Sequence, residues 1–102
     1  MIFVIARAEI KEGCLEKYIE IAKKNIPNVL AEEGCISYTI TTDFDSGLSA
    51  QKEIDPNAAT FVECWESMDH LKKHLAAPHM ALFREEAGPL RLSSTLQIVE
   101  AR

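Results

Sequence analysis

The sequence predicts one α+β domain built on a four-stranded antiparallel sheet. Four segments alternate their side chains with the period of a β-strand, and apolar residues at helical spacing fill the intervals between them. In chain order these segments give β-α-β-β-α(α)-β. A chain of 102 residues has room for one compact domain with one core, so we expect residues 1–102 to form a single domain.

The first two elements are a strand and a long helix. Side chains alternate from residue 2 to residue 10, and the opening half of this strand is apolar on both faces. Apolar residues then recur at helical spacing over residues 15–30, which predicts a helix with one wide buried face. Pro27 lies inside this helix and has no N–H to donate, so we expect a kink or a break near residues 25 and 26. Gly34 stands where a left-handed C-terminal cap belongs.

The middle of the chain predicts two strands separated by a long loop. Residues 35–42 alternate apolar with small or hydroxylated side chains and form the second strand. Turn-forming residues are dense over 43–57, where we expect a loop that contains a short strand near residues 48–52. Residues 60–66 form the third strand. It places three large side chains on one face: Phe61, Glu63 and Trp65.

Two helices and a strand complete the chain. Ser67 caps a helix that runs to Ala76, Pro78 starts a second helix that ends at Gly88, and residues 92–101 form the last strand. This order is the split β-α-β of ferredoxin-like folds, in which the helices cover one face of the sheet. The other face then needs a cover, and a second copy of the same chain is the simplest one.

Composition and charge exclude several classes of function. The net charge of −5, with no local basic run, argues against nucleic acid as a partner. The apolar start of the chain is far too short for a membrane span of roughly 20 residues or for a signal-peptide core, so we expect no membrane insertion and a cytoplasmic protein. The three cysteines are widely spaced and odd in number, which argues against a disulfide framework and favours buried free thiols.

The stretch "CWESMDHLKKHLAAPH", residues 64–79, holds the single tryptophan and all three histidines. On the first of its two helices, Met68, Leu71 and Leu75 mark the buried face, which puts His74 at the border of the core and His70 nearer to solvent. Periodicity alone favours a structural role for His74, bonded to a carbonyl; the alternative is a neutral, partly desolvated general base.

The other polar residues of this stretch also allow more than one role. His79 follows Pro78 in the first turn of its helix, where the dipole disfavours the protonated imidazole. His70 and His74 have the i, i+4 spacing of a metal pair, but no motif supplies a further ligand. Glu63 is costly if buried alone. It can pair with an arginine, Arg7 or Arg91, or it can orient a histidine.

Three segments resemble the antibiotic biosynthesis monooxygenase superfamily, and most closely its small bacterial quinol monooxygenases. They are "IPNVLAEEGCISY", "FVECWESMDHLKKHLAAPHM" and the stretch from Asp43 to Gln51 with its Gly47 and Ser49. The most specific elements are the Glu-Glu-Gly-Cys turn at residues 32–35 and the pattern that runs from Glu63 to His79. The resemblance covers nearly the whole chain.

The resemblance implies a dimer whose two sheets close into an α+β barrel, with a hydrophobic pocket in each protomer between sheet and helices. It implies oxidation of a quinol or phenolic aromatic substrate by molecular oxygen with no cofactor, neither flavin, haem nor metal. By the resemblance His74 becomes the candidate base and His79 a second polar contact, both catalytic candidates. Candidate substrate-binding residues are Tyr38, Glu63, Trp65 and Phe83.

Other activities occur among relatives of this kind. Haem-degrading relatives depend on an Asn on the first strand and on a Trp and a His on the helices after the third strand. At the aligned positions this chain has Ala6, His74 and Arg84, which argues against that activity. Isomerases of small phosphorylated carbonyl compounds would need a cationic pocket, for which the candidates are Arg7, Arg84 and Arg91. The third alternative is a dimeric module that binds an aromatic ligand without converting it.

Overall fold

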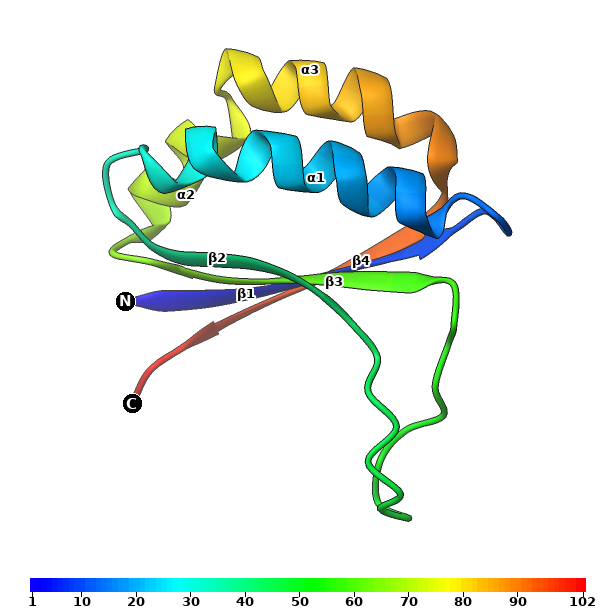
Figure 1. Ribbon diagram of the computed structural model, residues 1–102. Helices are drawn as coiled ribbons and strands as arrows, with labels where there is room; N and C mark the ends of the chain where they lie inside the picture. The colour runs from blue at the N-terminus through cyan, green and yellow to red at the C-terminus, as the bar shows by residue number, and fades with distance from the viewer.

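The computed structural model describes all residues, 1–102, as a four-stranded antiparallel sheet with three α-helices on one of its faces (Figure 1). The order β-α-β-β-α-α-β is the predicted one. The elements are β1 (Ile2–Ile10), α1 (Leu15–Leu30), β2 (Cys35–Thr42), β3 (Ala58–Trp65), α2 (Met68–Leu75), α3 (Pro78–Ala87), a 3-10 turn (Gly88–Leu90) and β4 (Arg91–Glu100).

The strands lie in the order β2-β3-β1-β4, so the first and third strands are central. In the register of β1 and β3, Val4 lies opposite Glu63 and Ala6 lies opposite Phe61. These pairs face the helices, because side chains on paired strands share a face. The core is formed mainly by this face of the sheet and by the inner side of the helices. Its largest fully buried side chains are Trp65, Tyr18, Ile10, Val4 and Val29.

A break in the first helix near residues 25 and 26 and a short strand near residues 48–52 were expected, and neither forms. Pro27 does not break the first helix, which runs without interruption to Leu30. Burial against the sheet on both sides of the proline, by Ala22 and by Val29, compensates for one missing hydrogen bond. No strand forms near residues 48–52: Gly47 has a φ of 74°, and the Gln51 side chain bonds back to the loop through the Phe44 carbonyl at 2.6 Å.

The 43–57 loop projects from the side of the sheet that the helices leave uncovered (Figure 1). Arg7 fixes its base with two hydrogen bonds to the Asp43 carboxylate, of 2.7 and 2.8 Å. The same carboxylate accepts the Asp55 N–H at 2.9 Å. These bonds, the Arg7 bond above all, lower the pKa of Asp43 to about 2. The Asp43 carboxylate therefore holds the two ends of the loop together.

The uncovered face of the sheet is apolar at one end. Phe3 and Val99 lie opposite each other on β1 and β4, and both are more than a third exposed, as are Ile5 and Val62 on the same face. Cys64 pairs with Phe3 in the register and belongs to this face as well. The expectation that this face needs a cover agrees with its exposed apolar residues.

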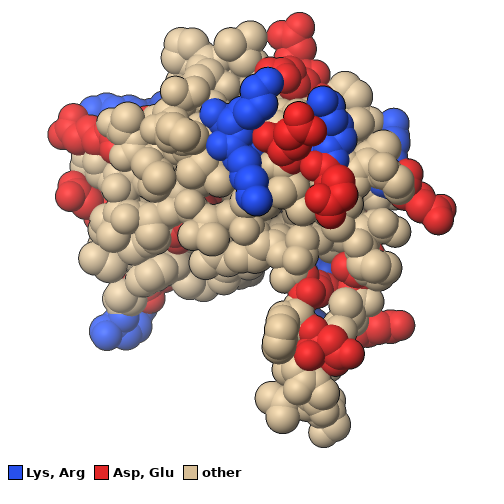
Figure 2. All heavy atoms as spheres, viewed as in Figure 1, with Lys and Arg blue, Asp and Glu red and all other residues tan.

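Charged side chains of both signs are interspersed over the helix layer (Figure 2). Opposite charges lie side by side there, so the net charge of −5 is not concentrated in one field over the helices. No helix is long and apolar enough to cross a membrane.

Candidate active site

A cavity of about 220 Å³ lies between the sheet and the helices. Side chains from β1, β2, β3, β4 and all three helices line it, and most of them are apolar. No residue of the 43–57 loop takes part, so that loop is not a lid over this space. Its polar or aromatic lining residues are Arg7, Tyr18, Tyr38, Phe61, Glu63, His74, Phe83, Arg84, Arg91, Ser94 and Thr95.

His74 is the most buried histidine, with 2% of its surface exposed. The predicted buried face of α2 is rotated in the structure, because Leu71 and His74 point inward while Met68 and Leu75 are exposed by 38% and 44%. The two exposed residues lie in the first and last turns of a helix of only eight residues, where the ends extend past the core. The ring of His74 packs on that of Trp65, with centroids 4.7 Å apart.

The Nδ1 of His74 lies 2.7 Å from Oε2 of Glu32. A carboxylate can only accept, so the imidazole donates from Nδ1 and carries its lone pair on Nε2. Nε2 has no hydrogen-bond partner within the protein. Every fully buried side-chain nitrogen or oxygen has such a partner, so Nε2 must be accessible. The accessible space next to His74 is the cavity that it lines. Burial lowers the pKa of His74 below its ordinary value, against the Glu32 hydrogen bond, which raises it. The arrangement can accept a proton from a molecule in the cavity.

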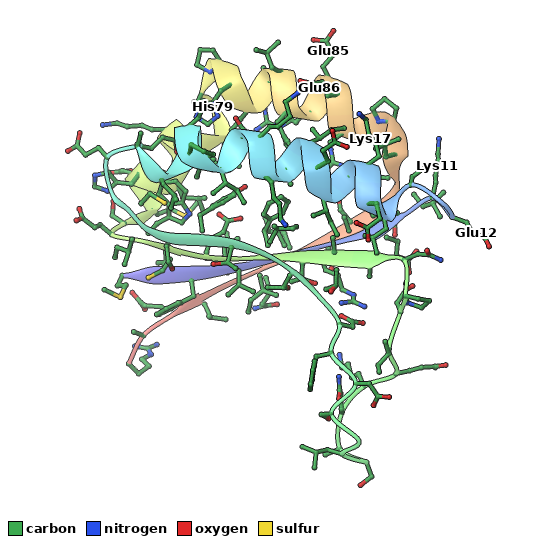
Figure 3. The ribbon with its side chains drawn as sticks, viewed as in Figure 1. Lys11, Glu12, Lys17, His79, Glu85 and Glu86 are labelled. Atoms are coloured by element: carbon green, nitrogen blue, oxygen red, sulfur yellow. The ribbon has the colours of Figure 1, made fainter.

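Glu32 also contacts the third histidine. Its other oxygen, Oε1, lies 2.6 Å from Nε2 of His79, and Nδ1 of that ring lies 3.1 Å from Oδ1 of Asn25. Both nitrogens of His79 thus face oxygen acceptors, a pattern that a doubly protonated ring satisfies. His79 lies between α1 and α3 and does not line the cavity (Figure 3).

Glu63 is buried within the cavity wall and pairs with neither an arginine nor a histidine. Its Oε1 accepts the indole N–H of Trp65 at 2.9 Å. Burial raises the pKa of Glu63 to about 7, although the Trp65 hydrogen bond lowers it, and the nearby Glu32 carboxylate adds to the rise. Both sequence-based alternatives for Glu63 are therefore wrong. The carboxyl group is held close to the point at which it changes charge near neutral pH.

Trp65 does not form a wall of the cavity. It is completely buried, behind His74 and Glu63, and it positions both of them. Tyr38 and Phe83, by contrast, line the cavity as the resemblance implies. The Tyr38 ring lies 5.2 Å from that of Phe61 and edge-on to His74 at 5.5 Å.

Two tyrosine hydroxyls are available to a molecule in the cavity. Neither Tyr18 nor Tyr38 forms a hydrogen bond from its hydroxyl to another protein group. Because no fully buried side-chain oxygen lacks a partner, both hydroxyls are accessible, and both residues line the cavity. Burial raises the pKa of both hydroxyls, so each remains a neutral donor. Tyr18 was not among the predicted site residues, because its place in the apolar stripe of α1 identifies it only as core.

His70 belongs to a different part of the structure. Its Nδ1 lies 2.7 Å from Oγ of Ser67, and its ring packs on Gly34, where an added Cβ would come within 2.2 Å of the ring. His70 and His74 therefore do not converge on a common point. No group of three or more His, Cys, Asp or Glu side chains is arranged to hold a metal ion.

The three arginines that line the cavity differ in their freedom. Arg7 is held by Asp43, and Arg84 donates to the Leu75 carbonyl at 2.5 Å. Arg91 makes neither a side-chain hydrogen bond nor a salt bridge, although it lines the cavity. The cationic pocket expected of an isomerase of phosphorylated compounds is thus reduced to one unpaired arginine.

Like Tyr18, Glu32 is a residue of the site that the sequence did not predict. It lies just past the end of α1, in the Glu-Glu-Gly-Cys turn that carries the resemblance. The sequence marks this turn as characteristic but assigns no role to Glu32. The two histidines that it contacts lie 42 and 47 positions further along the chain. Nothing in the local pattern links residues so far apart.

Comparison with known proteins gives consistent results. The family model described as antibiotic biosynthesis monooxygenase matches residues 1–86. The chain is 32% identical over 90 residues to the "Probable quinol monooxygenase YgiN" of Escherichia coli (strain K12), covering 88% of this chain and 82% of that protein.

Solved structures show the same fold. A conserved protein of Methanosarcina mazei superposes with a TM-score of 0.84 at 20% identity, covering 99% of this chain and 92% of its own. A protein of Shewanella oneidensis superposes with a TM-score of 0.80 at 25% identity, covering 96% and 87%. The ferredoxin-like architecture is therefore shared with these proteins.

Proposed function

Because this chain belongs to the antibiotic biosynthesis monooxygenase family, we propose that it is an oxygenase that oxidises a quinol or a related phenolic substrate with molecular oxygen and no cofactor. The observation that carries the proposal is the position of His74: a neutral imidazole, oriented by Glu32, with its free nitrogen at an apolar cavity. A relative that is 32% identical is described as a probable quinol monooxygenase, which supports a quinol as the substrate.

The first step is removal of a proton from a substrate hydroxyl. A phenol has a pKa of about 10, so little of it is ionised at neutral pH without a base. His74 accepts the proton at Nε2, and the electron pair of the O–H bond stays on the substrate oxygen. Glu32 accepts a hydrogen bond from Nδ1 while the proton arrives and stabilises the imidazolium that forms.

The substrate anion then supplies the electrons that oxygen requires. One oxygen atom enters the ring and the other leaves as water, so that a quinol and O₂ give a hydroxylated quinone and H₂O. The apolar wall that includes Phe61 and Phe83 excludes water around these charged species. Tyr18, Tyr38 and Glu63 present polar groups to the substrate, and a protonated Glu63 can donate a hydrogen bond to it.

A second copy of the chain is our proposal for the cover of the open face. That face exposes Phe3, Ile5, Val62 and Val99 together, which is unfavourable in water and suits the same patch on a partner. The homodimer and its two cavities then follow the arrangement implied for the family. All three cysteines are free, which suits the reducing cytoplasm as the place of action.

The proposed activity can be tested with ¹⁸O₂. Purified, metal-stripped protein is supplied with a panel of reduced naphthoquinols and benzoquinols, and the spontaneous oxidation is subtracted. The proposal predicts catalysed oxygen uptake and one ¹⁸O atom in the product. Uptake that yields only hydrogen peroxide would replace the monooxygenase with an oxidase.

Two further outcomes would favour the alternatives. A quinol that binds saturably without oxygen uptake would favour a ligand-binding module. Binding of inorganic phosphate that depends on Arg91 would favour an isomerase of phosphorylated compounds.

A further inference from the structure

We propose that Glu32 and His79 form a proton path from His74 to solvent on the far side of the helix layer. The inference rests on the proposed function of His74 as a base. It concerns a problem that the burial of His74 creates: when a substrate fills the cavity, Nε2 of this ring is cut off from water. The remaining contact through which a proton can leave is Nδ1.

The path consists of three hydrogen-bonded groups from three parts of the chain. His74 comes from α2, Glu32 from the turn after α1, and His79 from the first turn of α3. The two N···O distances are 2.7 and 2.6 Å, at and just below the short end of charge-assisted hydrogen bonds. Side-chain exposure rises along the path, from 2% at His74 to 17% at Glu32 and 22% at His79.

His79 ends the path at a second hollow. This hollow of about 190 Å³ lies between α1 and α3 and shares Phe83 with the wall of the inner cavity. His79 lines it together with Asn25, which contacts Nδ1 of the imidazole. Figure 3 shows His79 at the start of α3, beside α1. Most residues that line the hollow are polar or charged, whereas most of those that line the inner cavity are apolar, so the hollow admits water and small buffers. Its other polar residues are Lys24, Asn28 and Glu86.

The proton movement balances at each step. When His74 has taken the substrate proton at Nε2, its Nδ1 proton moves to Oε2 of Glu32, and His79 gives its Nδ1 proton to water in the hollow. When the reduced oxygen is protonated, His74 donates from Nε2 and recovers the Glu32 proton at Nδ1, while His79 takes a proton back from solvent. The path therefore lends one proton to solvent in each turnover and recovers it.

Other charged or titratable groups face these histidines and must be held constant in any test. Around His74 they are Glu63 on β3, Tyr38 on β2 and Arg84 on α3; around His79 they are Lys24 on α1 and Glu86 on α3. None of them joins the hydrogen-bonded path. Substitutions should therefore be confined to the two relay residues and a histidine outside the path.

Buffer rescue of His79→Gln tests the path directly. Glutamine retains a hydrogen-bonding group at this position but cannot carry a proton. The value of kcat for oxygen uptake should therefore fall, by up to about 10²-fold, which is the smallest effect typical of a positioned proton-transfer group. Added imidazole should restore it, with KM unchanged. Wild type and the control His70→Gln, whose histidine lies outside the path, should not respond to buffer. A loss without rescue, or no loss, would overturn the proposal.

A second measurement does not depend on turnover. The Nδ1 proton of His74 is observed by ¹⁵N-edited NMR, and its exchange with water is compared between proteins. The path predicts exchange several-fold slower in His79→Gln than in wild type and in His70→Gln. Equal rates would exclude the path even if the protein proved to be an oxygenase, whereas slowed exchange with no oxygen uptake would uphold the path and refute the oxygenase.

Discussion

The carboxylate of Glu32 lies 2.7 Å from the Nδ1 of His74, although the two residues are 42 positions apart in the chain. The contact brings the turn after α1 onto the buried end of α2. It fixes which nitrogen of His74 bears the proton and leaves the other free at the cavity. The chemistry that we propose depends on this single pairing.

Replacement of Glu32 by glutamine should show whether Glu32 orients His74 without contributing to substrate binding. The amide can present an N–H to Nδ1 and so favour the wrong tautomer, which should lower kcat for oxygen uptake by about 10²- to 10⁴-fold while KM changes little. Steady-state kinetics with the best quinol of the panel would measure the effect. Unchanged kcat in a folded Glu32→Gln protein would mean that His74 needs no orienting carboxylate.

The dependence of activity on pH should also reflect the contact between Glu32 and His74. His74 is active when neutral, and burial lowers its pKa, so activity should persist at pH 6.5 and fall only in more acidic solution. In Glu32→Gln the residual activity should persist to still lower pH, because the carboxylate that raises the pKa of His74 is gone. A profile that shifts toward higher pH in this variant would contradict the assignment.

Gly34→Ala should destabilise the protein for two separate reasons. Gly34 has a φ of +83°, which costs a residue with a Cβ about 1–2 kcal/mol, and the added carbon would lie 2.2 Å from the His70 ring. Gly13 is a matched control, since its φ is +82° and nothing lies within 4 Å of the position of an added Cβ.

Urea unfolding at constant m-value measures both glycine variants. The free energy of unfolding should fall more for Gly34→Ala than for Gly13→Ala. Equal losses would show that the close contact between Gly34 and His70 is relieved without cost.

Glu63→Gln should make the free energy of unfolding less dependent on pH. The pKa of Glu63 is about 7 in the folded protein against 4.5 when exposed, so the native state holds the extra proton between these values and stability falls as pH rises through them. The neutral amide keeps the bond from Trp65 without this loss. Between pH 4 and pH 8 the free energy of unfolding of Glu63→Gln should therefore rise relative to that of wild type by on the order of 3 kcal/mol. A difference independent of pH would show that Glu63 titrates normally.

The open face of the sheet predicts the effect of a charge there. Val62→Asp places a carboxylate within the exposed apolar patch, and we expect it to convert the dimer to monomers in sedimentation equilibrium. Leu82→Asp is the control, because Leu82 is 60% exposed on α3, outside the sheet. A monomeric wild type, or a dimer unaffected by Val62→Asp, would exclude this face as the interface.

The elements of the fold could be predicted because each depends on local pattern. The alternation of β1 and the helical spacing of α1 are strong signals, and the observed boundaries of these two elements coincide with the predicted ones. The short helix α2 gave a misleading signal. With eight residues, its apolar Leu75 lies at an end where the core no longer covers it, while the polar His74 lies over Trp65.

The site was less predictable, because its bonds join distant parts of the chain. His74 was identified through the resemblance, but its partner Glu32 and the shared contact with His79 depend on how three elements pack. Glu63 was recognised as costly to bury. Its partner, the indole of Trp65 two positions along the same strand, was overlooked because both side chains were assigned separate roles.

The most direct test of the account is oxygen uptake by wild type, His74→Ala and His70→Ala, compared side by side with the same quinol. The account predicts catalysed uptake by wild type, a loss of about 10²-fold or more in His74→Ala, and little change in His70→Ala. Full activity in a folded His74→Ala protein would contradict the assignment of His74 as the base on which the proposed reaction rests.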